Sequence, residues 1–414
     1  MTKRSRRRKQ LMTGDAIPRV IREPSSRAIA VRLPQAMAPY ARNAVRWRSG
    51  CEVTVLRDGS ETYPAMLAAL AAAQRTICLE TYILAGDQTG EKFKAVLIDR
   101  VKAGVQVRVI YDAVGSFGLS GAWVTGLRDA GIEVIDFNPI SPLRQRFRLS
   151  HRDHRKIIVV DDEVAFTGGL NIANEYASVD DGGIGWHDMH CRVTGAIVID
   201  LARMFRRTWL RAGGAYYLPL SANASSLAKT AGTSFVRLLD NTRRKQRATT
   251  RRAYLHVIRA ARERVWIENA YFLPDRGLRR ALARAARRGV DVRIIVPGRS
   301  DVRMIEWASL YVLRVLARRG VQILRWRGTM MHAKTALVDR VWSTIGSYNF
   351  DAMSRFNNLE VNIEILDDKV GDALVATFER DIANCEPWED ATWKNLPFYT
   401  KALAWICYRL RRFL

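Results

Sequence analysis

The chain has 414 residues, of which 48% are hydrophobic and 26% are charged. This composition is typical of a globular protein with a sizeable core, and it excludes a disordered chain, a collagen-like repeat and a disulfide-stapled mini-domain. Lysine and arginine outnumber the acidic residues by 67 to 41, so the net charge is +26. A surface this basic predicts a polyanionic partner: nucleic acid, an anionic membrane or a phosphorylated substrate.

The N-terminal segment is polar and basic, without the apolar stretch of a secretory signal. No run of apolar residues is long enough for a membrane span, so we expect a protein in the cytosol or at a membrane surface. The cysteines are scattered and form no C-x-x-C pair, which predicts reduced thiols and no zinc site. They are Cys51, Cys78, Cys191, Cys385 and Cys407.

Strand-like and helix-like segments recur in two matching sets along the chain. Residues 76–83 are similar to residues 265–272, and residues 103–110 to residues 288–295. Such alternation predicts an α/β fold made by duplication of one domain, with two mixed β-sheets and flanking helices packed about a pseudo-two-fold axis. The expected parts are a basic extension (1–48), a first half (49–217), a linker (218–232), a second half (233–388) and a basic amphipathic tail (389–414).

A polar motif occurs once in each half, with the pattern H-x-K-x4-D followed by G-[GS]-x-N. At every marked position 178 residues separate the two copies, a regularity that chance does not explain. The residues are His154, Lys156, Asp161 and Asn171 in the first half, and His332, Lys334, Asp339 and Asn349 in the second.

These residue types are the ones that phosphodiester chemistry needs. A neutral imidazole can attack phosphorus, and a second imidazole can protonate the leaving alkoxide. Lysine supplies positive charge to phosphate oxygens, and asparagine supplies amide donors. One copy of the motif holds one histidine, so we expect both copies to meet at one site.

On these motifs the chain resembles the phospholipase D superfamily, and more closely the bacterial cardiolipin synthases that lack N-terminal transmembrane helices. The closer resemblance covers about residues 50–390. It rests on residues 137–139, 151–156, 164–171, 186–188 and 346–351, with Ser354 and residues 358–360.

The resemblance implies a duplicated phospholipase D-like domain that works through a covalent phosphohistidine, without metal or cofactor. His154 is expected to be the nucleophile and His332 the general acid and base. Lys156, Lys334, Asn171 and Asn349 are expected to hold the phosphate oxygens. Asp188 and Glu360 stand where the family has carboxylates that orient a histidine. Asp161 and Asp339 are interpreted as structural anchors of the loop after the strand.

Three more histidines, His151, His187 and His190, lie around the first motif. They could form a metal site, or they could be surface or supporting residues. The second interpretation is favoured because phosphohistidine chemistry needs no metal and because no ordered set of acidic ligands accompanies them. The sequence therefore predicts no metal.

For a cardiolipin synthase the donor is phosphatidylglycerol, the acceptor is a hydroxyl of a second phosphatidylglycerol, and glycerol is released. Some relatives use phosphatidylethanolamine as donor or free glycerol as acceptor. The basic N-terminus and the aromatic, basic residues 398–414 predict binding to an anionic lipid surface. Together with this prediction, the resemblance implies a peripheral protein on the cytoplasmic face of the bacterial inner membrane. Residues 301–318 are a second amphipathic candidate, although packing into the core explains their pattern better.

The alternative is a phosphodiesterase or nuclease of the same superfamily that hydrolyses lipid or nucleic acid. The net charge and the basic residues 241–247 would serve phosphate binding equally well. No basic stretch is interleaved with aromatic residues for base stacking, which disfavours nucleic acid. Donor preference, the ratio of hydrolysis to transfer, oligomeric state and any partner protein stay open.

Overall fold

The computed structural model describes residues 47–140, 151–216, 232–242 and 248–411. Most of the predicted basic extension and of the predicted linker lies outside these residues. The first half contains β1 (Arg48–Arg57), α4 (Asp58–Ala71), β2 (Thr76–Thr81), α5 (Gln88–Lys102), β3 (Gln106–Asp112), α6 (Gly121–Asp129), β4 (Glu133–Phe137), β5 (Ile157–Val160), β6 (Val164–Gly168), η3 (Val179–Asp181), β7 (Met189–Thr194) and α7 (Ile197–Arg211).

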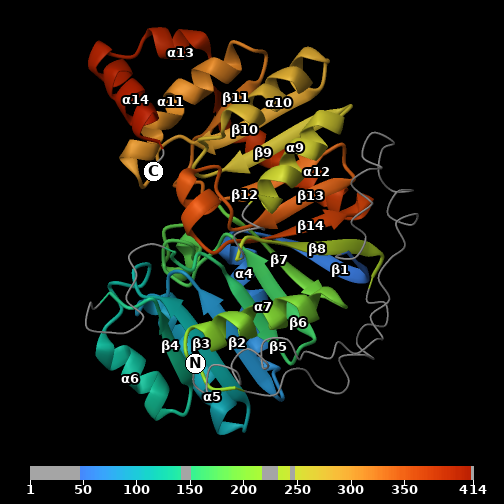
Figure 1. Cartoon of the computed structure of the whole chain (residues 1–414). Coiled ribbons are helices and arrows are strands. Elements are labelled where there is room, and N and C mark those ends of the chain that lie inside the picture. Colours follow the sequence, from blue (N-terminus) through green and yellow to red (C-terminus); the bar gives the residue numbers. More distant parts are fainter. Residues whose placement is uncertain (1–46, 141–150, 217–231, 243–247, 412–414) are drawn as a thin grey trace, which may run out of the picture.

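The second half repeats this order and then adds three elements. It contains β8 (Ser234–Asp240), α9 (Thr249–Ala260), β9 (Arg264–Asn269), α10 (Arg276–Arg287), β10 (Asp291–Pro297), α11 (Arg303–Ala317), β11 (Gln322–Trp326), β12 (Lys334–Val338), β13 (Trp342–Gly346), η4 (Met353–Asn357), β14 (Val361–Leu366), α12 (Asp368–Ala383), β15 (Cys385–Pro387), α13 (Asp390–Lys394) and α14 (Phe398–Leu410). The predicted duplication is therefore present element by element (Figure 1).

The expectation of two separate sheets is wrong, because all the strands form one 15-stranded mixed sheet. Its order is β15-β11-β10-β9-β12-β13-β14-β8-β1-β7-β6-β5-β2-β3-β4. From β11 to β4 the order is palindromic, so the pseudo-two-fold axis passes between β8 and β1. A strand with an open edge exposes unpaired N–H and C=O groups, and pairing each half's edge with its equivalent satisfies both. Arg48 pairs with Val236 and Cys51 with Ser234, with a register shift between the two pairs.

Strands β5 and β12 are covered on both faces. Every residue of β5 and of β12 is buried, as expected for strands covered on both sides. Of the three core clusters, one lies in the first half and one mainly in the second. The third contains residues of both, such as Val193 and Ile363. The two halves therefore share a core.

The C-terminal helix α14 packs on α11. Helix α11 itself packs into the core, as the favoured interpretation of its pattern predicts. Tyr311 and Tyr408 stack with their ring centroids 4.4 Å apart, and Arg279 donates to the Tyr408 hydroxyl at 2.7 Å. Ala404 and Cys407 are the buried residues of α14 itself. No helix in the described ranges is both long and apolar enough to cross a bilayer.

The motif aspartates shape tight turns after β5 and β12. Asp161 and Asp339, with the residue after each, have positive φ angles of 51–62° in the three-residue loops that join β5 to β6 and β12 to β13. The Asp161 carboxylate accepts backbone N–H bonds from residues 74–76, and Asp339 accepts them from residues 262–264. Each carboxylate thus ties its hairpin to the start of a neighbouring strand, β2 or β9, as a structural anchor would.

Asp339→Ala should lower the free energy of unfolding by about 2–3 kcal/mol, because three backbone N–H groups lose their acceptor. Urea unfolding of the purified variant measures this loss. The matched control, Asp372→Ala, removes an exposed carboxylate and should change stability by less than about 0.5 kcal/mol. Unchanged stability of Asp339→Ala would show that the anchor is dispensable.

Candidate active site

The two motif histidines come together where the halves meet. The backbone N–H of His154 donates to Leu359 O at 3.0 Å, and that of His332 donates to His187 O at 2.6 Å, so each is held by the other half. They are only 7% and 4% exposed. Burial first, and then the positive charges of Lys334, Lys156 and His154, lower the pKa of His332 well below its usual value. The contacts of each motif with the opposite half bring both motifs to the boundary between the halves.

Each half supplies the carboxylate that orients the motif histidine of the other half. Nδ1 of His154 lies 3.1 Å from Oε2 of Glu360, and Nδ1 of His332 lies 2.7 Å from Oδ2 of Asp188. Each contact engages one ring nitrogen and leaves Nε2 for chemistry. The structure therefore brings both predicted carboxylates to a histidine, in each case the histidine of the opposite half.

The two carboxylates have different electrostatic surroundings. Burial alone would raise the pKa of Glu360, but His154, Ser347 and Lys156 hold it below its usual value. Burial raises the pKa of Asp188 to about 6, although Lys334 partly opposes the shift. Burial also lowers the pKa of His154, with Glu360 opposing the shift. Both imidazoles are thus neutral at neutral pH, the state in which a ring nitrogen can act as a nucleophile.

The motif lysines lie beside the histidines and are fully enclosed. Nζ of Lys156 donates to His154 O at 2.8 Å, and Nζ of Lys334 lies 2.7 Å from Nδ1 of His332. Burial lowers the pKa of Lys156 to about 7 and that of Lys334 to about 8. Two buried ammonium groups without a bound anion are costly, so the site favours a negatively charged ligand.

The motif asparagines lie on the turns that follow β6 and β13. Asn171 accepts from the Ile83 N–H at 3.0 Å and donates to the Tyr176 hydroxyl at 2.7 Å, which leaves its second amide N–H for a ligand. Oδ1 of Asn349 is buried without a hydrogen-bond partner in the described structure.

One departure from symmetry in the motif has a steric cause. A Cβ at Gly169 would lie 2.0 Å from Oδ1 of Asp188, so this position must be glycine for Asp188 to reach His332. The equivalent residue, Ser347, donates its hydroxyl to Oε2 of Glu360. The first half makes room for its carboxylate, whereas the second half hydrogen-bonds to it.

Aromatic rings surround the histidines, and the sequence analysis assigned them no role. Tyr82 packs edge-on against His154 with centroids 4.9 Å apart, and Tyr176, Trp186 and Tyr271 lie within 6.2 Å of His332. The recurrence of an acidic residue shortly before Tyr82 and Tyr271 was the available signal. These rings exclude water from the site, which strengthens its electrostatic interactions.

The three additional histidines have separate environments. His151 has a φ of 69° and its carbonyl accepts from Asn138, while His190 lies in β7, where burial lowers its pKa to about 3. His187 faces two buried carboxylates, Glu268 and Asp381. The expectation that no ordered set of acidic ligands accompanies these histidines is therefore wrong for His187, because β9 and α12 supply two carboxylates from distant parts of the sequence.

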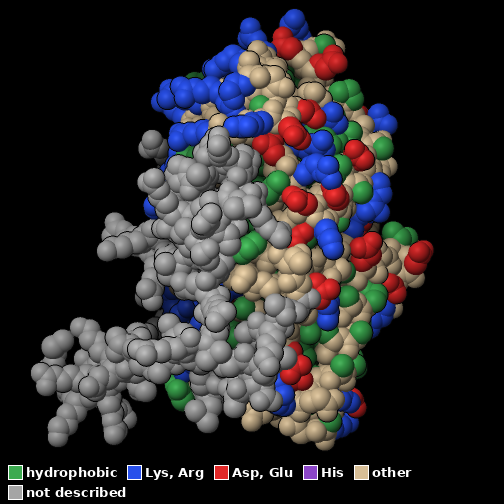
Figure 2. Space-filling view, turned by 90° about the vertical axis from the view of Figure 1, so that its right-hand side faces the viewer, with side chains coloured by type: hydrophobic (Ala, Val, Ile, Leu, Met, Phe, Trp, Pro, Cys, Tyr) green, Lys and Arg blue, Asp and Glu red, His purple; other side chains and the backbone are tan. Residues whose placement is uncertain are grey.

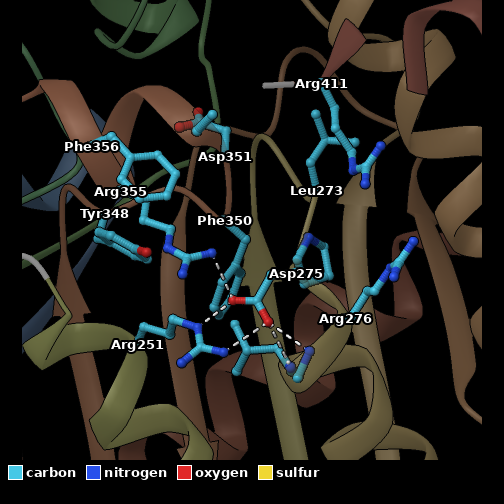
Figure 3. A pocket seen from close by; sticks show the side chains of 14 residues that line it. Arg251, Leu273, Asp275, Arg276, Tyr348, Phe350, Asp351, Arg355, Phe356 and Arg411 are labelled. Atoms are coloured by element: carbon cyan, nitrogen blue, oxygen red, sulfur yellow. Dashed lines mark hydrogen bonds and ion pairs between the residues drawn. The ribbon is translucent and has the colours of Figure 1, made fainter. Parts of the chain in front are cut away.

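A pocket of about 770 Å³ opens beside the second motif (Figure 3). Its lining includes Tyr348 and Phe350, which flank Asn349. Asp275 is ion-paired there with Arg251 and Arg355. Arg276 and Arg411 also line the pocket, so cations outnumber carboxylates around it.

Comparisons with known proteins agree with this geometry. The family model described as the PLD-like domain of cardiolipin synthase matches residues 66–184 and 254–382. The crystal structure of phosphatidylserine synthase from Haemophilus influenzae superposes with a TM-score of 0.65 at 15% identity, covering 87% of this chain and 95% of that one. Fold and motifs together define a phospholipase D-like enzyme with two copies of the domain in one chain.

Similar proteins of known family identify the family within this superfamily. A cardiolipin synthase of Alkalihalophilus pseudofirmus is 36% identical over 352 residues, covering 85% of this chain and 70% of that protein. Cardiolipin synthase B of Salmonella typhi is 35% identical, covering 84% of this chain and 86% of that protein. The chain belongs to the cardiolipin synthase family of the phospholipase D superfamily.

Gly169→Ala should lower kcat by about 10²-fold, because the new Cβ displaces Asp188 and with it the imidazole of His332. The control is Gly118→Ala, whose added Cβ meets no atom within 4 Å. Steady-state turnover of both variants, with circular dichroism to confirm folding, measures the effect. Equal activity of the two variants would mean that the position of Asp188 does not limit catalysis.

Proposed function

We propose that the site transfers a phosphatidyl group from one phosphatidylglycerol to the hydroxyl of a second, through a covalent intermediate on His154. The observation that carries this proposal is the pair of neutral, carboxylate-held imidazoles beside two buried lysines. Such a pair supplies one nucleophile and one proton carrier for a phosphodiester.

In the first step Nε2 of His154 attacks phosphorus, and the bond from phosphorus to the glycerol oxygen breaks. His332 gives its proton to that oxygen, and glycerol leaves. The negative charge of the incoming phosphodiester raises the pKa of His332, so that the ring can carry this proton. Lys156, Lys334 and the Asn171 and Asn349 amides hold the non-bridging oxygens while charge develops.

In the second step His332 takes the proton from a hydroxyl of the second phosphatidylglycerol. The resulting oxygen attacks phosphorus, the bond from phosphorus to nitrogen breaks, and His154 is regenerated. Glu360 stabilises the positive charge on the modified His154 ring throughout. The aromatic rings around the site keep water from competing with the acceptor hydroxyl. We assign the pocket of Figure 3 to the anionic headgroup of one of the two lipids.

We place the protein at an anionic membrane surface. Figure 2 shows Lys and Arg side chains gathered on the upper part of one face, which belongs to the second half. Exposed arginines on and just after α10 contribute to the charge of this half: Arg276, Arg280, Arg284, Arg287 and Arg288. Helix α14 presents exposed apolar side chains: Phe398, Tyr399, Trp405, Ile406 and Leu410. An apolar helix face combined with basic surroundings is typical of interfacial binding.

Purified protein incubated with phosphatidylglycerol liposomes should form cardiolipin and glycerol, as detected by mass spectrometry. His154→Ala and His332→Ala should each lower turnover by about 10²–10⁴-fold, and only wild type and His332→Ala should yield a phosphohistidine adduct. His256→Ala, a histidine outside the site, is the control. Full activity of either site variant would contradict the two-histidine mechanism. Phosphatidic acid as the sole product would show that the enzyme is a hydrolase.

The rate should have a bell-shaped dependence on pH. Asp188 must be ionised to hold His332, so activity falls as the pH drops through its pKa of about 6. Lys156 must be protonated to bind phosphate, so activity falls as the pH rises through its pKa of about 7. Initial rates between about pH 5 and pH 9 test this profile, and Asp188→Asn should lose the acid limb. A flat profile would exclude both groups as the controlling ones.

Trp405→Ser should weaken binding to phosphatidylglycerol vesicles by about tenfold, because about 1.5 kcal/mol of apolar burial is lost. Trp405→Phe keeps most of the apolar area and should bind nearly as well as wild type. Vesicle sedimentation measures both. Equal binding of the three proteins would show that α14 does not enter the membrane interface.

A further inference from the structure

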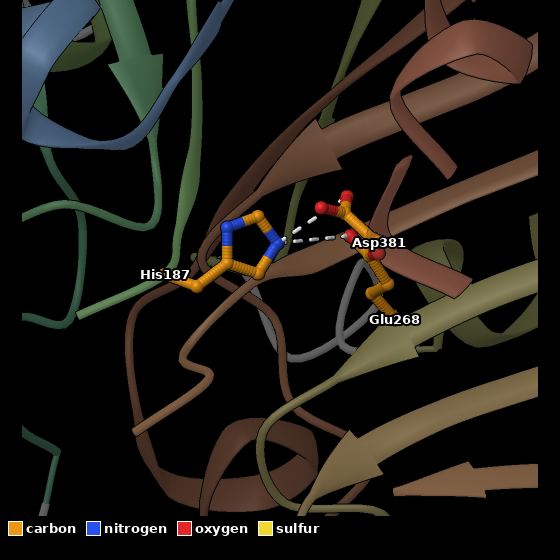
Figure 4. A group of neighbouring side chains, drawn as sticks. All are labelled: His187, Glu268 and Asp381. Atoms are coloured by element: carbon orange, nitrogen blue, oxygen red, sulfur yellow. Dashed lines mark ion pairs between the residues drawn. The ribbon is translucent and has the colours of Figure 1, made fainter. Parts of the chain in front are cut away.

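A second group of buried polar side chains lies behind His332, away from the reacting atoms. His187 precedes β7, Glu268 belongs to β9 and Asp381 to α12, and the three side chains converge (Figure 4). They are 2%, 1% and 0% exposed. Their candidate ligand atoms all lie within 4.8 Å of one another.

Each of the three side chains has a buried polar atom without a hydrogen-bond partner. Nε2 of His187, Oε1 of Glu268 and Oδ2 of Asp381 are buried with none in the described structure. Nε2 lies 3.5 Å from Oδ2 of Asp381 and 3.9 Å from Oε2 of Glu268, which is too long for ordinary hydrogen bonds. Ligand atoms that surround an ion tetrahedrally at 2.0–2.2 Å lie roughly 3.3–3.6 Å apart. The 3.5 Å distance lies within this range and the 3.9 Å distance lies just above it, so a small movement of Glu268 would bring all three groups onto a common cation.

The outer contacts are those of an oriented ligand set. Nδ1 of His187 contacts Oδ1 of Asp58 at 2.6 Å, which places the ring proton on Nδ1 and the lone pair on Nε2. Arg57 donates to Oδ1 of Asp381 at 2.7 Å and leaves Oδ2 facing the group. Trp326 stacks on the imidazole with centroids 4.6 Å apart and fixes its plane.

The first half has an arginine beside its buried glutamate, and the second half has none at the equivalent position. Glu80 is the counterpart of Glu268, and the guanidinium of Arg155 lies 3.6 Å from its carboxylate. The counterpart of Arg155 is Ala333, which brings no charge, and the counterpart of His187 is Leu359. In the second half Arg57 pairs with Asp381, but no arginine stands beside Glu268 at the position equivalent to Arg155. A buried carboxylate is stable only beside a positive charge, so Glu268 favours a nearby cation.

We propose that His187, Glu268 and Asp381 form a buried site for one divalent transition-metal ion, with Zn²⁺ as the best fit. One imidazole and two carboxylates are ligands that Zn²⁺ accepts at these distances. The ion stabilises the fold and fixes the segment that holds the general acid, because His187 O accepts the backbone N–H of His332 and Asp188 follows His187. It takes no part in phosphoryl transfer, and it replaces the expectation that the chain holds no metal.

The competing occupant is a proton. Burial alone would lower the pKa of His187, but Asp381, Asp58 and Glu268 raise it well above its usual value, so an imidazolium could supply the positive charge. Burial, with Asp381, raises the pKa of Glu268 to about 7. A proton on Nε2 of His187 can be donated to only one of the two carboxylates at a time, whereas a metal ion engages Glu268 and Asp381 together.

The test is the metal content of the purified full-length chain, measured by inductively coupled plasma mass spectrometry without added chelator. We expect about one ion per chain. The affinity for Zn²⁺ should fall by at least about 10–100-fold in Glu268→Gln, because loss of a direct ligand costs no less than loss of a group that orients a ligand. Glu80→Gln is the matched control, because it changes the equivalent carboxylate of the first half and should keep the metal.

A second measurement needs no variant. Chelator-treated wild type should gain thermal stability when Zn²⁺ is added, by an amount that grows with the Zn²⁺ concentration. Absence of bound metal together with an unchanged Tm on adding Zn²⁺ would overturn the proposal and leave the imidazolium as the cation. Neither metal content nor Tm depends on lipid turnover, so failure of the metal proposal can be distinguished from failure of the proposed reaction.

Discussion

The active site depends on two contacts in which a carboxylate of one half holds the motif histidine of the other half. Glu360 holds His154 and Asp188 holds His332, and each pair also joins the halves through a backbone hydrogen bond beside it. Catalytic geometry and assembly of the two halves are therefore set by the same residues. A displacement of one half against the other would move both imidazoles off their carboxylates together.

The sheet gives this contact its rigidity. Because β1 and β8 join the halves into one sheet, and because one core cluster contains residues of both, the histidines sit on a common frame. Strands β5 and β12 are buried on both faces, so the motif segments that precede them have little freedom. Sites built on strands of a packed sheet hold their side chains more accurately than sites built on mobile loops.

Much of the fold and of the active site could be predicted from the sequence. A short motif that is weak evidence alone becomes specific when it occurs twice with the same spacing. The histidines, the lysines and the anchoring aspartates were found from one repeated motif, and the structure brings the histidines and lysines together as expected. The partners of the histidines could be proposed only by resemblance, since nothing in the spacing of Asp188 and Glu360 shows that each crosses to the other half. The single sheet was missed because the pairing of β1 with β8 depends on edges far apart in the sequence. The group around His187 was missed for a similar reason: its acidic members come from β9 and α12.

The palindromic strand order has a consequence for how such a chain could arise. Two identical copies of one half, paired edge to edge through the strand equivalent to β1 and β8, would build the same sheet and the same crossed contacts. In such a homodimer every substitution appears twice, so the two histidines must stay alike. Fusion into one chain removes that constraint: Gly169 and Ser347, or Arg155 and Ala333, can differ. In a fused chain one half can therefore specialise as the source of the nucleophile and the other as the source of the acid. Two identical subunits cannot specialise in this way.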